Sequence, residues 1–226
     1  MRDLTVPEQK EIWDRRNANE SFRDLAPDPR VLHYIGDLPQ QSRRALDLGC
    51  GNGRHLLQLA EIGWRCTGID WSTEALVQTR QALSGFEQTT SVLNGDFRRT
   101  TFSGNYFHLI LAIDVIHHGK RRDLERAIAE IKRIKAISGD VLVSLPGMRN
   151  APAEHQADWI EEQTVVLRNG LEVGIPHHFI KEEDIGKLFR TFRKISAERV
   201  VLPMPPGVEP LHSMHENEWY WIRLSG

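Results

Sequence analysis

The sequence has very little cysteine and no long apolar run, and these absences remove whole classes of protein. Cys50 and Cys66 are the only cysteines among 226 residues and do not form a CxxC pair, so we expect reduced thiols and no cysteine-held metal. No apolar stretch approaches the roughly 20 residues that a membrane-spanning helix needs. The polar beginning of the chain contains no signal-peptide core. A soluble cytoplasmic protein with no membrane contact is therefore expected.

An excess of charge of one sign is also missing. The chain has 29 Lys and Arg residues against 31 Asp and Glu residues, a formal net charge of −2. Such a balance gives no overall attraction to nucleic acid or to anionic lipid, although a local basic face remains compatible with it. A chain of this length fits one α/β domain with a modest elaboration.

Short apolar segments alternate with amphipathic segments through the middle of the chain. Strands are expected over residues 43–48, 64–69, 90–94, 106–113 and 140–145, and helices over residues 53–62, 72–84 and 121–136. Two further strands are expected near the end, over residues 195–202 and 218–224. The alternation predicts an α/β fold with a Rossmann-like, doubly wound, mostly parallel seven-stranded sheet and helices on both faces.

The segments on either side of this core are less regular. A helix over residues 7–23 is expected to lie over the domain, and a second short helix over residues 31–35. Beyond Pro146 we expect a helix and a strand within residues 154–168, and another helix over residues 181–192.

Residues 45–54 (ALDLGCGNGR) run from a predicted strand through three glycines into a predicted helix. Glycines at such a turn let the backbone bend sharply and approach a ligand closely. Their spacing differs from the dinucleotide fingerprint GxGxxG, and the chain has no GxxxxGK[ST] phosphate loop. Asp47 stands just before the glycines, where its carboxylate would repel a pyrophosphate and attract an ammonium group. The loop therefore predicts a ligand with a cationic group.

Two more carboxylates end the next two predicted strands. Asp70 follows Asp47 by 23 residues, at the position from which an acidic side chain reaches ribose hydroxyls in this kind of fold. Asp96, in the segment NGDF, could accept a hydrogen bond from an adenine amino group. The alternative for Asp96 is a structural role in a turn.

The segments ALDLGCGNGR, GIDWS, NGDF and FHLILAIDVIHH occur in this order, and together they resemble class I S-adenosylmethionine-dependent methyltransferases of the type 11/12-like group. The resemblance covers about residues 43–146. It implies S-adenosylmethionine as the cofactor and S-adenosylhomocysteine as the product. It also implies a single methyltransferase domain with an N-terminal helical cap (1–40), a cofactor-binding core (43–146) and a substrate-side elaboration with the last strands (147–226).

The resemblance further implies which residues contact the cofactor. The methionine part would lie along Asp47, Gly49, Cys50, Gly51, Asn52 and Gly53, the ribose at Asp70 with Trp71, the adenine at Asp96 with Phe97, and the border of the cofactor at Asp114. An N-terminal helix often closes over the cofactor in this family, and that closure would bring Trp13 and Arg16 to it.

Two pairs of histidines are candidates for the chemistry. His117 and His118 follow the fourth predicted strand, where the methyl group would project, and either could act as a general base or orient the acceptor. The alternative is that this pair only packs a loop. His177 and His178 are candidates for lining the acceptor site. A metal held by them together with the histidines of residues 211–215 is conceivable, but the proline-rich polar surroundings favour a loop and we expect no metal site.

Several functions remain open at this point. The first interpretation is methyl transfer to an O, N or S atom of a small-molecule acceptor, because the tail shows no nucleic-acid module. The second is a tRNA methyltransferase, because residues 112–134 resemble the family that methylates wobble-uridine side chains in tRNA. The acidic balance and the missing proline-glycine-glycine turn at residues 136–140 count against it. The third is a non-catalytic partner subunit that binds the cofactor. A dehydrogenase is disfavoured by the glycine spacing and Asp47.

Overall fold

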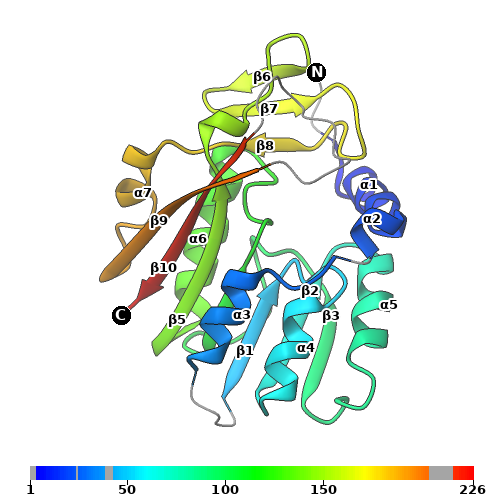
Figure 1. Cartoon of the computed structure of the whole chain (residues 1–226), viewed down its shortest axis with the longest axis vertical. Coiled ribbons are helices and arrows are strands. Elements are labelled where there is room, and N and C mark those ends of the chain that lie inside the picture. The colour runs from blue at the N-terminus through cyan, green and yellow to red at the C-terminus, as the bar shows by residue number, and fades with distance from the viewer. Residues whose placement is uncertain (1–3, 24, 39–42, 204–215) are drawn as a thin grey trace.

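The computed structural model describes residues 4–23, 25–38, 43–203 and 216–226. His212 and His215, considered above as metal ligands, lie outside the described residues. Figure 1 shows a large sheet with helices packed against it, while a small sheet and the first helices stand over one end of it. Among the described residues, no helix is both long and apolar enough to cross a bilayer.

The large sheet has seven strands in the order β3-β2-β1-β4-β5-β10-β9. These strands are β1 (Arg44–Leu48), β2 (Arg65–Asp70), β3 (Thr90–Asn94), β4 (Phe107–Ala112), β5 (Lys135–Pro146), β9 (Lys194–Pro203) and β10 (Glu216–Ser225). The first five run parallel, and β10 is antiparallel to both β5 and β9. The predicted seven-stranded, mostly parallel sheet is thus confirmed. The order reverses at β1, so the carboxyl ends of β1 and β4 open the crevice where such sheets bind ligands.

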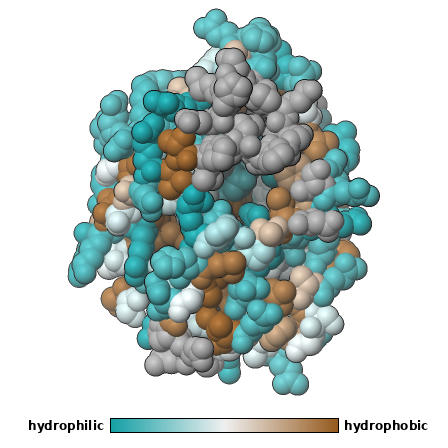
Figure 2. All heavy atoms as spheres, in the orientation of Figure 1, coloured by the Kyte–Doolittle hydropathy of each residue, from teal (hydrophilic) through white to brown (hydrophobic). Residues whose placement is uncertain are grey.

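Helices cover both faces of this sheet. They are α3 (Pro29–Gly36), α4 (Arg54–Glu61) and α5 (Thr73–Ala82) on one face, and α6 (Arg121–Ile134) and α7 (Glu182–Leu188) on the other. In β4, Leu109 and Leu111 belong to the apolar cluster between the sheet and helices α3, α4 and α5. Ile110 belongs to the cluster between the sheet and helices α6 and α7, because successive side chains of a strand point to opposite faces. On the face drawn in Figure 2, hydrophilic side chains cover much of the surface and apolar side chains form separate patches.

Helix α6 illustrates how the sequence pattern produces an element. Leu124, Ile128 and Ile131 recur every three or four residues and are all buried against the sheet, as one stripe of a helix. At the start of α6, the Asp123 carboxylate accepts a hydrogen bond from the backbone N–H of Lys120 at 3.2 Å, which satisfies one of the unpaired donors there.

Three expected boundaries were wrong by four residues or more. The helix expected over residues 181–192 is α7, which already ends at Leu188. The helix expected over residues 7–23 is two helices, α1 (Val6–Ala18) and α2 (Glu20–Arg23), because Asn19 adopts an extended conformation (φ −71°, ψ 132°) between them. Strand β5 begins at Lys135, immediately after α6 and five residues before the expected start. There, Nζ of Lys135 donates hydrogen bonds to the carbonyl oxygens of Ala136 and Gly139, at 2.8 and 2.9 Å, and these bonds hold the early part of the strand.

The helix expected within residues 154–168 was also wrong. This segment forms a hairpin of β6 (Ala157–Glu161) and β7 (Thr164–Leu167), which β8 (Pro176–His178) extends into a three-stranded sheet in the order β6-β7-β8. β7 is buried along its whole length, and its β-branched residues suit a strand in that environment. Figure 1 shows this small sheet and α1 above the carboxyl ends of the parallel strands.

Candidate functional site

The glycine loop after β1 has the backbone geometry that its sequence predicts. Gly49, Gly51 and Gly53 have φ values of 65°, 55° and 80°, all in the left-handed region that favours glycine. A Cβ atom on Gly49 would lie 2.3 Å from Cγ2 of Val115, so this glycine also allows two segments to approach closely. A Cβ on Gly51 would meet nothing within 4 Å, because this residue faces an open cavity.

The cavity in front of Gly51 lies at the carboxyl ends of the parallel strands and under α1. It contains about 610 Å³ of empty space, counted out to its open mouth and including open solvent. Its lining residues are Trp13, Arg16, Asn17, Gly49, Gly51, Ile69, Asp70, Trp71, Gly95, Phe97, Asp114, Val115 and His118. Nine of these are sequence-predicted site residues, which therefore come together here from five separate segments.

Asp70 ties the glycine loop to the end of β2. One carboxylate oxygen accepts a hydrogen bond from the backbone N–H of Gly51 at 3.0 Å, and the other accepts one from Ser72 at 2.8 Å. Burial raises the pKa of Asp70, although these two N–H groups partly offset the effect. Since a carboxylate oxygen can accept two hydrogen bonds, Asp70 can support the loop and still bind hydroxyl groups in the cavity.

Asp47 lies beneath the loop and borders a smaller hollow that adjoins the cavity. Its side chain is buried, and its Oδ2 has no hydrogen-bond partner among the described residues; Nδ1 of His55 is 4.0 Å away. Burial raises the pKa of Asp47 to about 7. A buried carboxylate without a partner is costly, and an ammonium group arriving in this hollow would satisfy it. The site therefore fits a ligand with a primary ammonium.

Besides Asp47, four predicted contact residues lie outside the main cavity. Asp96 begins a turn that its carbonyl oxygen closes by accepting from the N–H of Arg99 at 3.1 Å. It lines a different hollow from Phe97, and its carboxylate is paired with the guanidinium of Arg98 at 2.9 Å. Asn52 borders the smaller hollow, where its Nδ2 donates to the carbonyl oxygens of Arg23 and Leu25. Gly53 lies against Thr79 instead. The fourth such residue, Cys50, is buried beside the smaller hollow.

His118 borders the cavity with a fixed ring orientation. Its Nδ1 lies 3.0 Å from the carbonyl oxygen of Val115, a contact in which Nδ1 donates a proton, so in the neutral ring Nε2 keeps its lone pair. The Trp13 ring lies edge-on at a centroid distance of 4.7 Å. The basic nitrogen of the neutral His118 ring is therefore Nε2, which points away from Val115.

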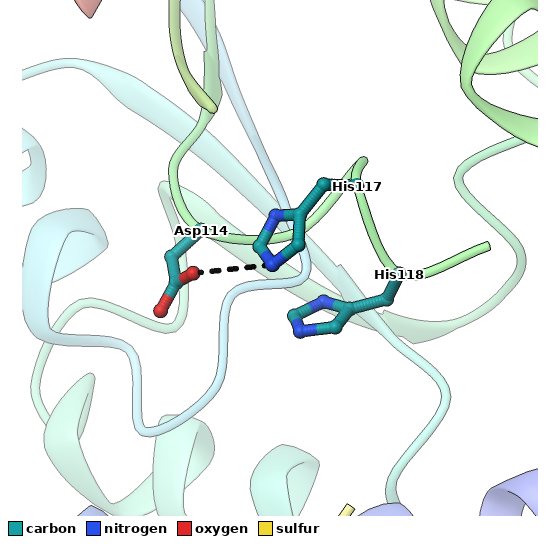
Figure 3. Close-up of side chains that lie close together, drawn as sticks. All are labelled: Asp114, His117 and His118. Atoms are coloured by element: carbon teal, nitrogen blue, oxygen red, sulfur yellow. Dashed lines mark ion pairs between the residues drawn. The ribbon is translucent and has the colours of Figure 1, made fainter. Parts of the chain in front are cut away.

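His117 sits deeper than its neighbour. Figure 3 shows His117 between Asp114 and His118, with Nε2 of His117 3.6 Å from Oδ1 of Asp114. Burial, together with the charge of His118, holds the pKa of His117 well below its usual value, so its ring is neutral. Because His117 does not line the cavity, the two histidines of the predicted pair have different surroundings.

A glutamate that the sequence analysis did not single out occupies the centre of the histidine group. Oε2 of Glu172 lies 2.6 Å from Nε2 of His177 and 3.7 Å from Nε2 of His118, while Oε1 pairs with Nε of Arg16. Burial opposes ionisation of Glu172, but its interactions with the two histidines and Arg16 prevail and hold its pKa well below the usual value. Glu172 lies in the loop between β7 and β8, where no motif marks it.

The two residues of the second predicted pair, His177 and His178, lie on opposite faces of β8. His177 points toward Glu172, whereas His178 is fully buried and bonds to Oγ1 of Thr164 at 2.7 Å on the other face of β8. Donor atoms of Asp114, His117 and His118, and those of His118, Glu172 and His177, form two groups within 4.8 Å, a spacing compatible with a metal ion. The Glu172 carboxylate is already satisfied by Arg16 and His177.

Comparison with known proteins agrees with this geometry. Residues 45–139 match the family described as "Methyltransferase domain". YqeM of Bacillus subtilis (strain 168) is 33% identical over 107 residues, which cover 46% of this chain and 42% of YqeM. The tRNA U34 carboxymethyltransferase of Aliivibrio salmonicida (strain LFI1238) is 32% identical over 117 residues, which cover 50% of this chain and 34% of that protein. The chain thus matches less than half of the length of these relatives.

A solved structure shows the same fold. The Burkholderia thailandensis 1,6-didemethyltoxoflavin-N1-methyltransferase, with bound 1,6-didemethyltoxoflavin and S-adenosylhomocysteine, has a TM-score of 0.68 and 13% sequence identity. The match covers 97% of this chain and 87% of that one. The sequence match, the seven-stranded sheet and the glycine-loop cavity lead to one conclusion. The chain contains a class I S-adenosylmethionine-dependent methyltransferase domain.

Proposed function

We propose that this protein transfers the methyl group of S-adenosylmethionine to an O, N or S atom of a small-molecule acceptor. The observation that carries the proposal is the placement of His118. A histidine with a fixed tautomer borders the same cavity as Gly51 and Asp70, on the side where the loop after β4 closes it. The bound cofactor supplies a methyl group already activated on a sulfonium.

The residues around the cavity suit the separate parts of that cofactor. Asp47, buried without a partner, is proposed to hold the ammonium of the methionine part. Asp70 is proposed to accept hydrogen bonds from the ribose hydroxyls, and Trp71 and Phe97, whose ring centroids are 6.4 Å apart, to flank the adenine. Asp96 is not assigned to the adenine, because Arg98 holds its carboxylate outside the cavity.

Methyl transfer requires the accepting atom to be aligned with the methyl group and, for a protonated acceptor, the removal of one proton. Nε2 of His118 is the atom proposed to accept that proton. Glu172, 3.7 Å away, would stabilise the imidazolium that forms, and His177 would orient Glu172. His117, buried and neutral, is proposed to support the turn and not to take part in proton transfer.

We also propose that the three parts expected from the sequence act together in one domain. From the cap, Trp13 and Arg16 reach the cavity, and from the substrate-side part, Glu172 and His177 reach His118. The acceptor would therefore enter between α1 and the small sheet.

The first experiment is calorimetric titration of the purified protein with S-adenosylmethionine, S-adenosylhomocysteine and NAD. We expect micromolar binding of the two sulfur compounds and none of NAD. Transfer of labelled methyl groups to pooled small metabolites and, separately, to bulk tRNA then identifies the acceptor class. His118→Ala should keep the affinity for S-adenosylhomocysteine and lose at least 100-fold in transfer rate. Absence of binding by the folded protein would overturn the proposal.

A further inference from the structure

A second, wider hollow lies beside the cofactor cavity. Its lining residues are Leu4, Val6, Gln9, Asp96, Arg98, Arg99, Lys120, Arg122, Asp123, Arg126, Trp159, Ile160, Val166, Gly174 and Pro176. The function proposed above assigns no role to this surface. We call it the basic hollow, because five of these side chains are cationic and only two are anionic.

The basic hollow and the cofactor cavity share their walls. Helix α1 contributes Gln9 to the basic hollow and Trp13 to the cavity, and the segment after β3 contributes Arg98 to one and Phe97 to the other. The guanidinium of Arg98 lies 4.7 Å from the centroid of the Trp71 ring, which lines the cavity. Because Trp13 also packs edge-on against His118, a molecule bound in the basic hollow would lie next to the wall of the cavity that holds the proposed base.

The positive charge of the basic hollow is local. The whole chain has a net charge of −2, whereas the lining residues carry five cationic and two anionic side chains, an excess of three positive charges. The two carboxylates are paired within the hollow: Asp96 with Arg98 at 2.9 Å, and Asp123 with Arg98 and Arg126 at 3.5 and 3.6 Å. Such a concentration of cations attracts anionic groups.

Two carboxylates outside the basic hollow, on α6 and β6, have partners of their own. Glu125 pairs with Nε of Arg121 at 3.2 Å, and Oε1 of Glu161 accepts hydrogen bonds from the backbone N–H of Arg121 and from Oγ1 of Thr164. None of these residues lines the basic hollow. At its edge, Trp159 is 43% exposed and offers a flat ring on which a base could stack.

We propose that the basic hollow binds phosphate groups of the methyl acceptor and so orients the acceptor toward the cavity. This inference rests on the proposed methyl transfer and narrows its acceptor to a phosphate-bearing molecule. Arginine is well suited to this task, because its guanidinium binds phosphate oxygens in pairs. A small phosphorylated metabolite and an RNA strand offer the same chemistry, and the probes below distinguish them.

The test compares wild-type protein with two double variants that lose the same charge. Arg99→Gln/Arg126→Gln removes two exposed cations from the basic hollow. The control, Arg65→Gln/Arg190→Gln, removes two exposed arginines that line neither the hollow nor the cavity. The probes are inorganic pyrophosphate, uridine 5′-monophosphate and a fluorescent single-stranded RNA of about 15 nucleotides. S-adenosylhomocysteine affinity is measured for all three proteins.

We expect the hollow variant to bind at least one phosphate probe at least fivefold more weakly than wild type, and the control variant to bind it like wild type. If only the affinity for the RNA falls, the phosphate groups that the basic hollow binds belong to an RNA strand. If the affinity for the small probes also falls, they belong to a phosphorylated metabolite. Equal affinities in all three proteins, equal losses in both variants, or no binding of any probe would overturn the inference. Failure of the wild type to bind S-adenosylhomocysteine would instead overturn the proposed function.

Discussion

Glu172 and His177 are joined by a hydrogen bond of 2.6 Å between Oε2 and Nε2, beside His118, which lines the cavity. The same carboxylate pairs with Arg16, so it connects the helical cap to the loop before β8. Both ion-pair partners are mostly buried, with side-chain exposures of 15% and 17%. We therefore expect Glu172→Gln to lower the free energy of unfolding by about 3 kcal/mol at pH 7, because it leaves Arg16 buried without a counter-charge.

Glu162 provides the matched control, because its pairing with Lys181 at 3.3 Å is largely exposed. Glu162→Gln should cost less than about 1 kcal/mol. Urea unfolding of both variants measures the difference, and equal costs would contradict a structural role for the Glu172 pair.

The Glu172 contribution should depend on pH in a defined direction. Its pKa is held well below the usual value in the folded protein, so its contribution is complete above the unfolded pKa of about 4.3 and is lost as the pH falls through the folded pKa. The stability gap between wild type and Glu172→Gln should therefore stay constant from pH 8 to about 5 and narrow below it. Urea unfolding across this range tests the prediction; a gap that widens on acidification would refute it.

Asp47→Asn should stabilise the free protein and weaken cofactor binding. With a folded pKa of about 7, the Asp47 carboxyl lowers stability progressively as the pH rises from about 4 to 7, because ionisation is disfavoured in the folded state. The variant should therefore gain stability relative to wild type at pH 8 and differ little at pH 4. If Asp47 pairs with the cofactor ammonium, affinity for S-adenosylhomocysteine should fall about tenfold at pH 8. Thermal unfolding and calorimetry at both pH values check the two expectations.

Two glycines of the loop should respond differently to alanine. Gly49→Ala forces a methyl group against Val115 and a side chain into the left-handed region, so we expect a loss of about 3 kcal/mol of stability. Gly51→Ala has the same backbone cost of about 1 kcal/mol but no clash, and its methyl group enters the cavity. It should weaken cofactor binding more than it lowers stability. Urea unfolding and calorimetric titration with S-adenosylhomocysteine are measured on both variants. A larger stability loss for Gly51→Ala than for Gly49→Ala would contradict the prediction.

Asp70→Ala should remove much of the affinity for S-adenosylhomocysteine while the protein remains folded. We expect at least a tenfold loss, because hydrogen bonds to a charged acceptor contribute about 1.5–3 kcal/mol. The variant also frees the N–H groups of Gly51 and Ser72, so a stability loss of about 1–2 kcal/mol is expected with it. Unchanged affinity in calorimetry would remove Asp70 from the ribose site.

The sheet and the glycine loop were accessible from the sequence because their signals are local. The strand expected over residues 90–94 is β3 with those same bounds, and the left-handed glycines 49, 51 and 53 stand where the spacing placed the turn. Parallel strands bring their carboxyl ends to one edge, so Gly51, Asp70 and Phe97 could be expected to meet without any knowledge of the packing.

Other features depended on contacts between distant segments. The hairpin of β6 and β7 has no decisive period of its own and is fixed by burial of Val165 and Val166. Asp96 lies in a turn, and its pairing with Arg98 holds its carboxylate outside the cavity.

The sequence by itself determined the fold class, the cofactor family and most of the cavity, since strand periodicity and turn glycines act over a few residues. Only the tertiary structure decided which side chains surround His118. It brought Glu172 to Arg16, 156 residues away in the chain, and His177 to His118. Side chains so far apart in the chain have no sequence pattern in common, and their meeting follows from how α1 and the small sheet pack over the strands.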